Sequence, residues 1–550
     1  MAKRKKEVSE ESDFEAYNDG SDSDASYSAK TRKKPARTQV AKPTKRRRGT
    51  PAEERSVTTT ANPHSRGTHV MQSSDKVRTA LLGWYQLVHE TRGMPWRKAF
   101  NPQRSRAERA QRAYEVWVSE IMLQQTQVAT VIPYYNRWME KFPAIADLHT
   151  PNDSSDPAKA AANIDEVNAL WKGLGYYSRA SRLLAGAQKV VKELGGLLPD
   201  NAKDMESKIP GIGRYSAGAI CSIAYGEKVP VLDGNVHRLL SRFLMLHSNP
   251  KSKATLDTLW TAAEAMVDVK GFYEDTDYQN PGDINQALIE LGSTVCKVQN
   301  PSCGTCPLKD LCGAYQKSSF ATQHSQDIQD IEDLCSVCEP LPTGSFDVTL
   351  LPMKAEKKKS REETDIVNVV EWRRSIDSEE RWFLLVKRPE KGLLAGLDEF
   401  PTMSNVSDPD SKRHSAEGPV EVLSSVLASP VRRSSLAAKT DEECVESSDS
   451  DVRISQVKRV GDVLHIFSHV RKTYRSQWVL LEGGCSPPPV STKSSERMSR
   501  NKTTKGKQKK AESTDVTPVS GEARWVSIDQ VDHANISTGM AKVWALAQSL

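Results

Sequence analysis

Residues 209–226 read IPGIGRYSAGAICSIAYG, a glycine turn followed by a helical pattern. Two glycines, Gly211 and Gly213, stand one residue apart just before Arg214 and a helical pattern. Such a tight turn exposes backbone N–H groups at a positive helix N-terminus, which hold a phosphate without reading base sequence. An ordinary pair of helices joined by a turn has the same pattern. The turn alone therefore does not distinguish a phosphate-binding site from a structural connection.

An acidic residue stands nineteen residues after Arg214, inside the apolar run VLDGNV (231–236). A carboxylate is costly to bury, so Asp233 is expected to have either a chemical role or a partner. The structural alternative for Asp233 is a helix N-cap.

Four of the nine cysteines form one cluster with the spacing C-x6-C-x2-C-x5-C, namely Cys296, Cys303, Cys306 and Cys312. Four thiolates can enclose a zinc ion or an iron–sulfur cluster. Zinc sites usually pair two short C-x2-4-C arms, and only one arm is short here, which favours [4Fe-4S]. Disulfides fit poorly, because the cysteine count is odd and no secretory signal is visible.

Composition sets the class of protein. Hydrophobic residues make up 37% of the 550 and the mean hydropathy is −0.58, so a substantial part should be tail or linker. No apolar run approaches the roughly 20 residues that span a bilayer. Residues 30–48 carry ten Lys or Arg and no acid, which indicates nuclear localisation or a nucleic-acid patch, with a solvated tail as the alternative. We expect a nuclear protein, with the mitochondrion as a second compartment.

The polar tracts predict the domain organisation. A disordered basic tail (1–70) precedes a helical domain (71–315), a connector (316–345) and a β-rich domain (346–550). The β-type runs are DVTLLPM (347–353), DIVNVVEW (365–372), RWFLLVKR (381–388), VLHIFSHV (463–470) and SQWVLLEG (476–483). Two Ser-rich, charged insertions, 404–455 and 484–522, are predicted to be disordered.

The chain resembles the adenine DNA glycosylase (MutY) family, of the helix-hairpin-helix iron–sulfur DNA glycosylase superfamily and of eukaryotic, fungal type. The resemblance rests on the glycine turn, the cysteine spacing and the segments WVSEIMLQQTQV (117–128), IPYY (132–135), GLGYYSR (173–179) and VLDGNV (231–236). It implies a multidomain fold, in which an all-α domain with a [4Fe-4S] loop (296–312) precedes an α/β Nudix-like domain.

Two carboxyl groups can divide the work of glycosidic cleavage between protonation of the leaving group and stabilisation of the sugar cation. Glu120 lies in an apolar helical pattern, where burial should raise its pKa and keep a proton available. The resemblance assigns base protonation to Glu120 and cation stabilisation to Asp233, supported by Tyr215 and Asn235. Relatives that also cut the strand carry a lysine at the position of Tyr215, so we expect a monofunctional enzyme.

The resemblance also implies which residues contact DNA. A flipped-out adenine would be lined by Arg92, Met94, Trp96, Arg97 and Gln286, and the vacated stack would be filled by Gln125 and Tyr176. The DNA backbone would be held by Gly211, Gly213 and Arg214. The basic segment 98–116 is longer than in bacterial relatives and is expected to be a DNA-facing or solvent loop.

The C-terminal stretch 388–401 (RPEKGLLAGLDEFP) resembles the family's Nudix-like domain. Because no helix with REUxEE-type metal ligands follows it, we expect a binding module without pyrophosphatase activity. The run Phe467, Ser468 and His469 matches the loop that recognises 8-oxoguanine, with a β-turn as the alternative. Positive charge beside it comes from His465, Arg471, Lys472 and Arg475.

Cys335 and Cys338 have metal-ligand spacing and predict either a zinc site, completed by His324 or His69, or two free thiols. Residues 328–334 are a candidate docking segment for a checkpoint clamp or another repair protein. The predicted enzyme is a monomer that acts on double-stranded DNA.

Three functions remain open at this point. The first is hydrolytic removal of adenine opposite 8-oxoguanine or guanine, which initiates base excision repair. The second is a related glycosylase acting on thymine mismatches or oxidised pyrimidines. The third is a catalytically silent DNA-binding scaffold, against which the Glu120 and Asp233 pair argues.

Overall fold

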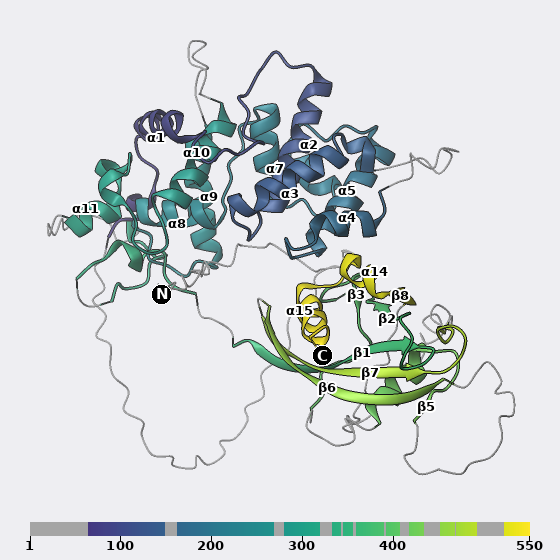
Figure 1. Cartoon of the computed structure of the whole chain (residues 1–550). Helices are drawn as coiled ribbons and strands as arrows, with labels where there is room; N and C mark the ends of the chain where they lie inside the picture. The colour runs from purple at the N-terminus through teal and green to yellow at the C-terminus, as the bar shows by residue number, and fades with distance from the viewer. Residues whose placement is uncertain are drawn as a thin grey trace, which may run out of the picture. The chain divides into compact units, whose positions relative to one another are not determined.

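The computed structural model forms two compact units (Figure 1). It describes residues 64–148, 162–268, 280–319, 333–342, 345–355, 359–389, 392–407, 417–433, 452–467, 469–491 and 522–549. Within these, unit 1 comprises the parts up to 128 and from 197 to 355, and unit 2 the parts from 129 to 196 and from 356 onward. The expected helical domain, 71–315, is therefore divided between the two units.

Unit 1 is built of helices (Figure 1). The α-helices are α1 (Ser74–Val88), α2 (Arg106–Leu123), α6 (Ala202–Lys208), α7 (Arg214–Ile220), α8 (Gly234–Phe243), α9 (Lys253–Val267), α10 (Pro281–Thr294) and α11 (Gly313–Ser319). Short 3-10 turns are η1 (Arg66–His69), η5 (Cys303–Thr305), η6 (Lys309–Leu311) and η8 (Val348–Leu350), and α7 continues as a π-helical turn, η4 (Cys221–Tyr225).

Helix α2 begins inside the segment that the sequence analysis expected to be a loop. Ser105 and Glu108 form a capping box, in which each side chain bonds the other residue's backbone N–H. The expectation of a loop over 98–116 is therefore wrong from residue 106 onward. The Ser-x-x-Glu pattern was the signal for this helix start.

Close backbone packing places the catalytic segments of unit 1. Gly211 has a φ of +82° in the turn between α6 and α7, a conformation that favours glycine. On α10, a Cβ at Gly292 would lie 2.7 Å from the Asn235 carbonyl oxygen. Only glycine at 292 lets α10 pack this closely against the start of α8.

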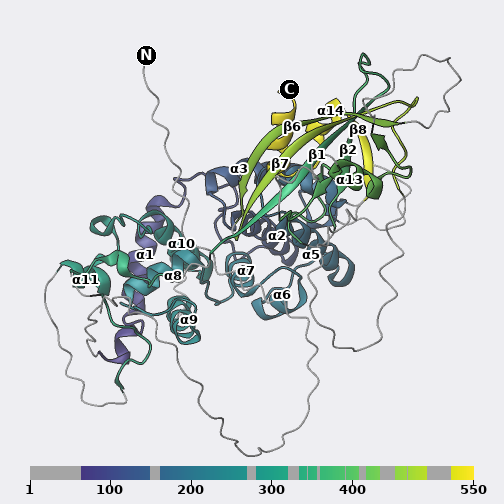
Figure 2. The same cartoon turned by 90° about the horizontal axis from the view of Figure 1, so that it is seen from below.

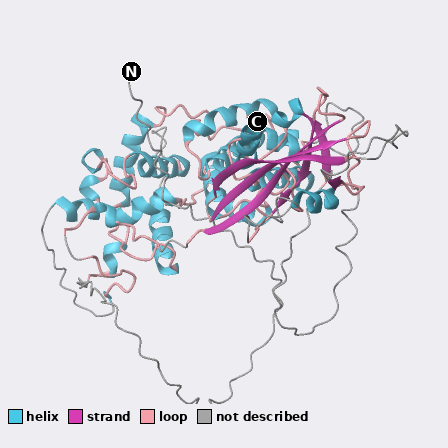
Figure 3. Ribbon diagram, turned by 60° about the horizontal axis from the view of Figure 1, so that its bottom comes forward, coloured by secondary structure: helices cyan, strands magenta, loops and turns pink. Residues whose placement is uncertain are grey.

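Unit 2 combines helices with one mixed sheet, which Figure 3 shows in magenta. The helices are α3 (Val128–Lys141), η2 (Ile145–Leu148), α4 (Ile164–Trp171), α5 (Ser178–Leu194), α13 (Gly418–Val426), α14 (Ile528–His533) and α15 (Thr538–Ala547). The strands are β1 (Arg361–Arg373), β2 (Trp382–Lys387), β3 (Asp398–Glu399), β4 (Thr402–Met403), β5 (Arg432–Arg433), β6 (Arg453–Ile466), β7 (Val470–Glu482) and β8 (Ala523–Ser527).

The sheet has the strand order β3-β2-β1-β7-β6-β5, with β4 on β1 and β8 on β2. Figure 2 shows its long strands β6, β7 and β1 side by side. Strands β1 and β7 run parallel, whereas β6 pairs antiparallel with β7. Apolar residues of α14 and α15, such as Val531 and Trp544, pack on one face. Leu423 and Val426 of α13 pack on the other face, so the predicted α/β fold class is confirmed for this part.

Three predicted segments differ from the structure. Residues 347–353 belong to unit 1 and form no strand but contain the 3-10 turn η8 (Val348–Leu350), and Val348 and Leu351 bury their side chains beside Ala314. The insertion predicted over 404–455 contains α13, whose apolar side chains pack against the sheet, and β5, which pairs with β6. Similarly, Val490 of the second predicted insertion forms a bridge with Leu427.

Several expectations fall outside the described residues: the basic tail up to 63, His324, Ser468 and most of 328–334. Among the helices that the structure describes, none is both long and apolar enough to cross a membrane.

Candidate active site and metal centres

Glu120 lies on α2 and is buried, with only 8% of its surface exposed. Trp117 and Ile121 on the same helix are almost wholly buried as well. The Tyr215 hydroxyl, from α7, donates a 2.8 Å hydrogen bond to Oε2 of Glu120. The helix after the glycine turn therefore orients this carboxyl group.

Asp233 is the N-cap of α8, as the structural interpretation of the sequence predicted. This position does not exclude a chemical role for its carboxyl group. Its Oδ1 accepts the Val236 backbone N–H at 2.7 Å, and its Oδ2 accepts the Asn235 side-chain amide at 2.8 Å. Both bonds favour the ionised carboxylate and fix its orientation. Asp233 is half-buried, so part of its surface remains accessible.

The two carboxyl groups differ in their electrostatic surroundings. Burial, reinforced by the charge of Asp233, raises the pKa of Glu120 to about 7, against the opposing effects of Tyr215 and Arg97. Burial also raises the pKa of Asp233, while its hydrogen bonds act in the other direction. The pKa of Tyr215 lies well above its usual value, so this hydroxyl remains a donor. At neutral pH, Glu120 can supply a proton beside a hydrogen-bonded carboxylate.

The predicted adenine-pocket residues of unit 1 are organised by an acid that sequence reasoning missed. Glu290 on α10 is 2% exposed and accepts hydrogen bonds from Arg92 at 3.2 Å and from Arg97 at 2.8 Å. Gln286, one turn earlier, donates to the Gly282 carbonyl at 3.2 Å. An acid in the apolar pattern of α10 was a signal of the same kind as Glu120. Two further predicted pocket residues, Met94 and Trp96, are buried.

The two predicted wedge residues share an uncommon backbone conformation. Gln125 has a φ of +54° and Tyr176 a φ of +50°, in the left-handed region that residues other than glycine rarely adopt. Both are exposed, Tyr176 by 48%. Strain at exposed positions of this kind is typical of ligand-contacting sites.

The predicted 8-oxoguanine loop is the turn between β6 and β7. The Phe467 N–H donates to the Val470 carbonyl at 2.8 Å, and the His465 ring contacts the Phe467 ring edge-on. His469 is exposed at this tip. The bond between Phe467 and Val470 closes the β6–β7 hairpin, and the role of this tip in DNA recognition stays a prediction. Of the basic residues expected beside it, Lys472 is buried against Asp365, so its charge is not available for phosphates.

The glycine turn presents backbone rather than side chains. Gly211 is exposed, and Gly213 is the N-cap of α7. The Arg214 guanidinium stacks over the Trp260 ring, 3.7 Å from its centroid. Arg214 thus stiffens the turn, and the amides are the groups that suit a phosphate.

The four clustered cysteines follow α10 and surround an apolar hollow lined by Leu239, Phe243 and Leu308. Burial raises the pKa of the free Cys306 thiol to about 12 and that of Cys312 to about 11. Arg242 of α8 donates to the Cys296 sulfur at 3.3 Å. Four soft donors in a dry, positively flanked pocket fit an iron–sulfur cluster.

Comparisons with known proteins agree with this geometry. A family model described as HhH-GPD superfamily base excision DNA repair protein matches residues 118–265, and one for the iron–sulfur binding domain of endonuclease III matches residues 296–312. The adenine DNA glycosylase of Homo sapiens is 36% identical over 485 residues, covering 86% of this chain and 74% of the relative. The adenine DNA glycosylase of Schizosaccharomyces pombe is 34% identical over 414 residues, covering 72% of this chain and 80% of the relative.

The chain belongs to the adenine DNA glycosylase family. It is a base excision repair enzyme that cleaves N-glycosidic bonds, and the predicted iron–sulfur cluster is confirmed. A solved Nudix hydrolase from M. smegmatis has a similar structure, and the match covers 36% of this chain and 88% of the hydrolase chain. Its sequence identity is 13% and its TM-score is 0.19. The family assignment rests on the sequence identities.

Hydrogen bonds connect the loop that carries the cluster cysteines with Asp233. Arg238 donates to the Cys296 carbonyl at 2.8 Å and to the Asn235 side-chain oxygen at 2.9 Å. Asn235 in turn donates to Asp233. The loop that carries the first cluster cysteine thus helps to orient Asp233.

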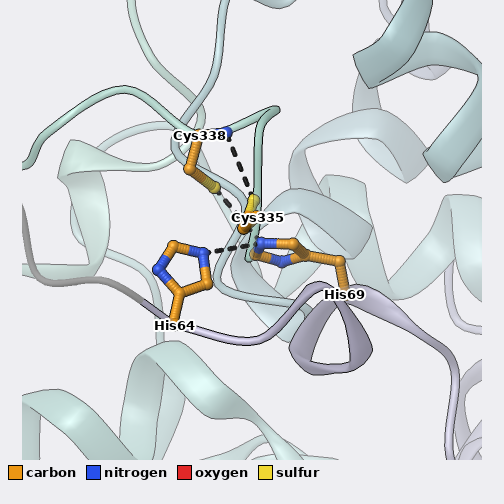
Figure 4. A group of neighbouring side chains, drawn as sticks. All are labelled: His64, His69, Cys335 and Cys338. Carbon is orange, nitrogen blue, oxygen red and sulfur yellow. Dashed lines mark hydrogen bonds between the residues drawn. The ribbon is translucent and has the colours of Figure 1, made fainter. Parts of the chain in front are cut away.

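The structure brings together a second candidate metal-binding group, of which three residues were predicted from the sequence. His64, His69, Cys335 and Cys338 each direct one ligand atom to a common point, with all four atoms within 4.8 Å of one another (Figure 4). His69 Nε2 lies 3.0 Å from His64 Nε2 and 3.3 Å from the Cys338 sulfur. Sequence reasoning named His69 but missed His64, although the H-x4-H spacing is typical of zinc sites.

Proposed function

We propose that this adenine DNA glycosylase removes adenine paired with 8-oxoguanine or guanine, by hydrolysis and without cutting the strand. The observation that carries the proposal is the buried, proton-holding Glu120 beside the oriented carboxylate of Asp233. Cleavage needs one carboxyl group that gives a proton and one that stabilises the sugar cation, and the raised pKa of Glu120 beside the hydrogen-bonded Asp233 supports this division.

The proposed mechanism begins with extrusion of adenine from the duplex. Glu120 protonates the adenine, which then leaves as a neutral base. Asp233 stabilises the positive charge that develops on the sugar, and a water molecule completes the hydrolysis. Tyr215 stands where an amine nucleophile would be needed, so the product is an abasic site in an intact strand.

The direct test is base release from duplexes that differ only in the mismatched pair. We expect adenine release opposite 8-oxoguanine and, more slowly, opposite guanine, with strand breakage only after alkali. Release of thymine or of an oxidised pyrimidine instead would favour the related glycosylase functions. Strand breakage without alkali would contradict the monofunctional assignment.

The turn between β6 and β7 is proposed to read the base opposite the adenine. Replacing His469 by Ala should lower the preference for 8-oxoguanine over guanine by about tenfold, the equivalent of one lost base contact worth about 1.4 kcal/mol. Single-turnover rates on the two duplexes measure this ratio. Lys458→Ala, an exposed change on β6, is the matched control and should leave the ratio unchanged.

We also propose that His64, His69, Cys335 and Cys338 bind zinc. Burial lowers the pKa of His69, which keeps the imidazole neutral as a ligand must be. Its Nδ1 contacts the Leu244 carbonyl at 2.8 Å, which leaves Nε2 for the metal. Two thiols and two imidazoles match the tetrahedral donor set of structural zinc.

Replacing Cys338 by Ala should remove the zinc and lower the melting temperature, because the metal joins the N-terminal segment to the connector. Metal analysis of the purified protein measures zinc and iron separately. Cys485→Ala, an exposed thiol, should retain both metals. Wild-type protein without zinc, or equal zinc in the Cys338 variant, would contradict this site.

The nuclear compartment is proposed from the basic run 30–48. Transport of a fluorescent fusion with that run deleted would test it.

A further inference from the structure

In unit 2, helix α4 is joined to the sheet by an ion pair. Lys387, at the end of β2, places its Nζ 2.9 Å from each carboxylate oxygen of Asp165, in the first turn of α4. The side-chain amide of Asn535 donates to the Asp165 carbonyl at 3.0 Å. Asp165 therefore contacts two segments that lie more than 200 residues later.

The other end of α4 is held in the same way. Lys172, its C-cap, donates to the Asp532 carbonyl at 2.6 Å and to the Ala534 carbonyl at 3.1 Å. Lys172 begins the loop that carries Tyr176, the predicted wedge. The Trp171 indole closes this loop with a 3.0 Å bond to the Gly175 carbonyl. The contacts of Lys172 therefore fix the base of the wedge loop.

The segment that accepts the contacts of Lys172, residues 532–535, is itself held by hydrogen bonds. The Trp544 indole donates to the Asp532 carboxylate at 2.8 Å, and the Asp398 N–H donates to the Asn535 carbonyl at 3.0 Å. Lys387 belongs to β2, in the same sheet as the β6–β7 turn with His469. A displacement of α4 relative to this sheet would thus shift Tyr176 relative to His469.

We propose that these four residues, Asp165, Lys172, Lys387 and Asn535 (the α4 latch), are positioning residues that fix the wedge loop relative to the opposite-base reader. The inference rests on the proposed function, in which Tyr176 and His469 act on the two strands at one base pair. The Asp165 side chain is 50% exposed and that of Lys387 25%, and such a pair contributes little to global stability. Its effect is on geometry, to which recognition is sensitive at the scale of about 1 Å.

Charge reversal tests the α4 latch, because the double reversal restores the ion pair that each single reversal removes. We would compare Asp165→Lys, Lys387→Asp and the double reversal in the full chain, measuring single-turnover adenine release opposite 8-oxoguanine and opposite guanine. Each single variant should lose about tenfold of the preference for 8-oxoguanine. The rate opposite guanine should not change, and the double reversal should recover most of the preference. Glu193→Lys, in the exposed pair with Lys189 on α5, is the matched control.

The outcomes separate the two proposals. A wild-type protein without any preference for 8-oxoguanine overturns the proposed function itself. A wild-type preference that both single variants retain overturns the latch alone. Equal loss opposite both bases, or a double variant that recovers nothing, also overturns it, because either result indicates damage to folding rather than to relative position. Thermal melting of each variant verifies that the chain is folded.

Discussion

Replacing Glu120 by Gln should lower the rate of adenine release by about 10²–10⁴-fold, the usual contribution of a general acid. The amide has the shape of the carboxyl group and can still accept the Tyr215 hydrogen bond, but it has no proton to give to the leaving base. The rate is measured under single-turnover conditions as alkali-dependent strand breakage opposite 8-oxoguanine. An unchanged rate would show that Glu120 is not the acid.

The same residue should set the upper limit of the pH profile. Since the pKa of Glu120 is raised to about 7, the protonated form predominates below this pH and is lost above it. The single-turnover rate should therefore fall by about tenfold per pH unit on the alkaline side. A rate that stays level to pH 9 would place the proton donor elsewhere.

The free energy of unfolding gives an internal control for the Glu120→Gln variant. The folded state binds the Glu120 proton more tightly than the unfolded state, whose pKa is near 4.5, so the free energy of unfolding decreases as pH rises from 4.5 to about 7. At 1.36 kcal/mol per unit, the wild type loses about 3 kcal/mol over this range. Glu120→Gln avoids this loss and should melt higher than the wild type at pH 8. An inactive but more stable variant cannot owe its inactivity to misfolding.

Replacing Arg242 by Met should destabilise unit 1 by about 3–5 kcal/mol and deplete the iron–sulfur cluster, because a buried charge with many acceptors is lost. Arg242 is 2% exposed. It donates to the carbonyls of Lys297 at 2.7 Å, Val298 at 3.1 Å and Leu351 at 2.9 Å, and to the Cys296 sulfur. Methionine fills similar space but leaves these acceptors without a donor.

Iron content, the visible absorbance of the cluster and the melting temperature measure this effect. The matched control is Arg182→Met, an exposed position on α5, where a change within about 0.5 kcal/mol is expected. Full iron content in Arg242→Met would show that the four cysteines and the apolar hollow hold the cluster without this side chain.

The sequence was most informative where function depends on a local pattern. The glycine turn, the cysteine spacing and the acids at 120 and 233 are each contained within a few residues. It was least informative at boundaries. The pattern of 347–353 is that of a strand, yet Val348 and Leu351 are buried beside Ala314, and the apolar positions of α13 were obscured by the charged residues around them.

The sequence alone determined the residue types and spacings on which the predicted chemistry depends: the glycine turn, two acids in apolar runs, four clustered cysteines and a tyrosine in place of an amine. Only the tertiary structure decided which distant groups meet. Glu290 gathers Arg92 and Arg97, His64 joins the cysteines of the connector, and Lys387 reaches Asp165. The physical reason is that a spacing motif reflects local backbone geometry, whereas the partner of a buried charge is fixed by how separate helices and strands pack together.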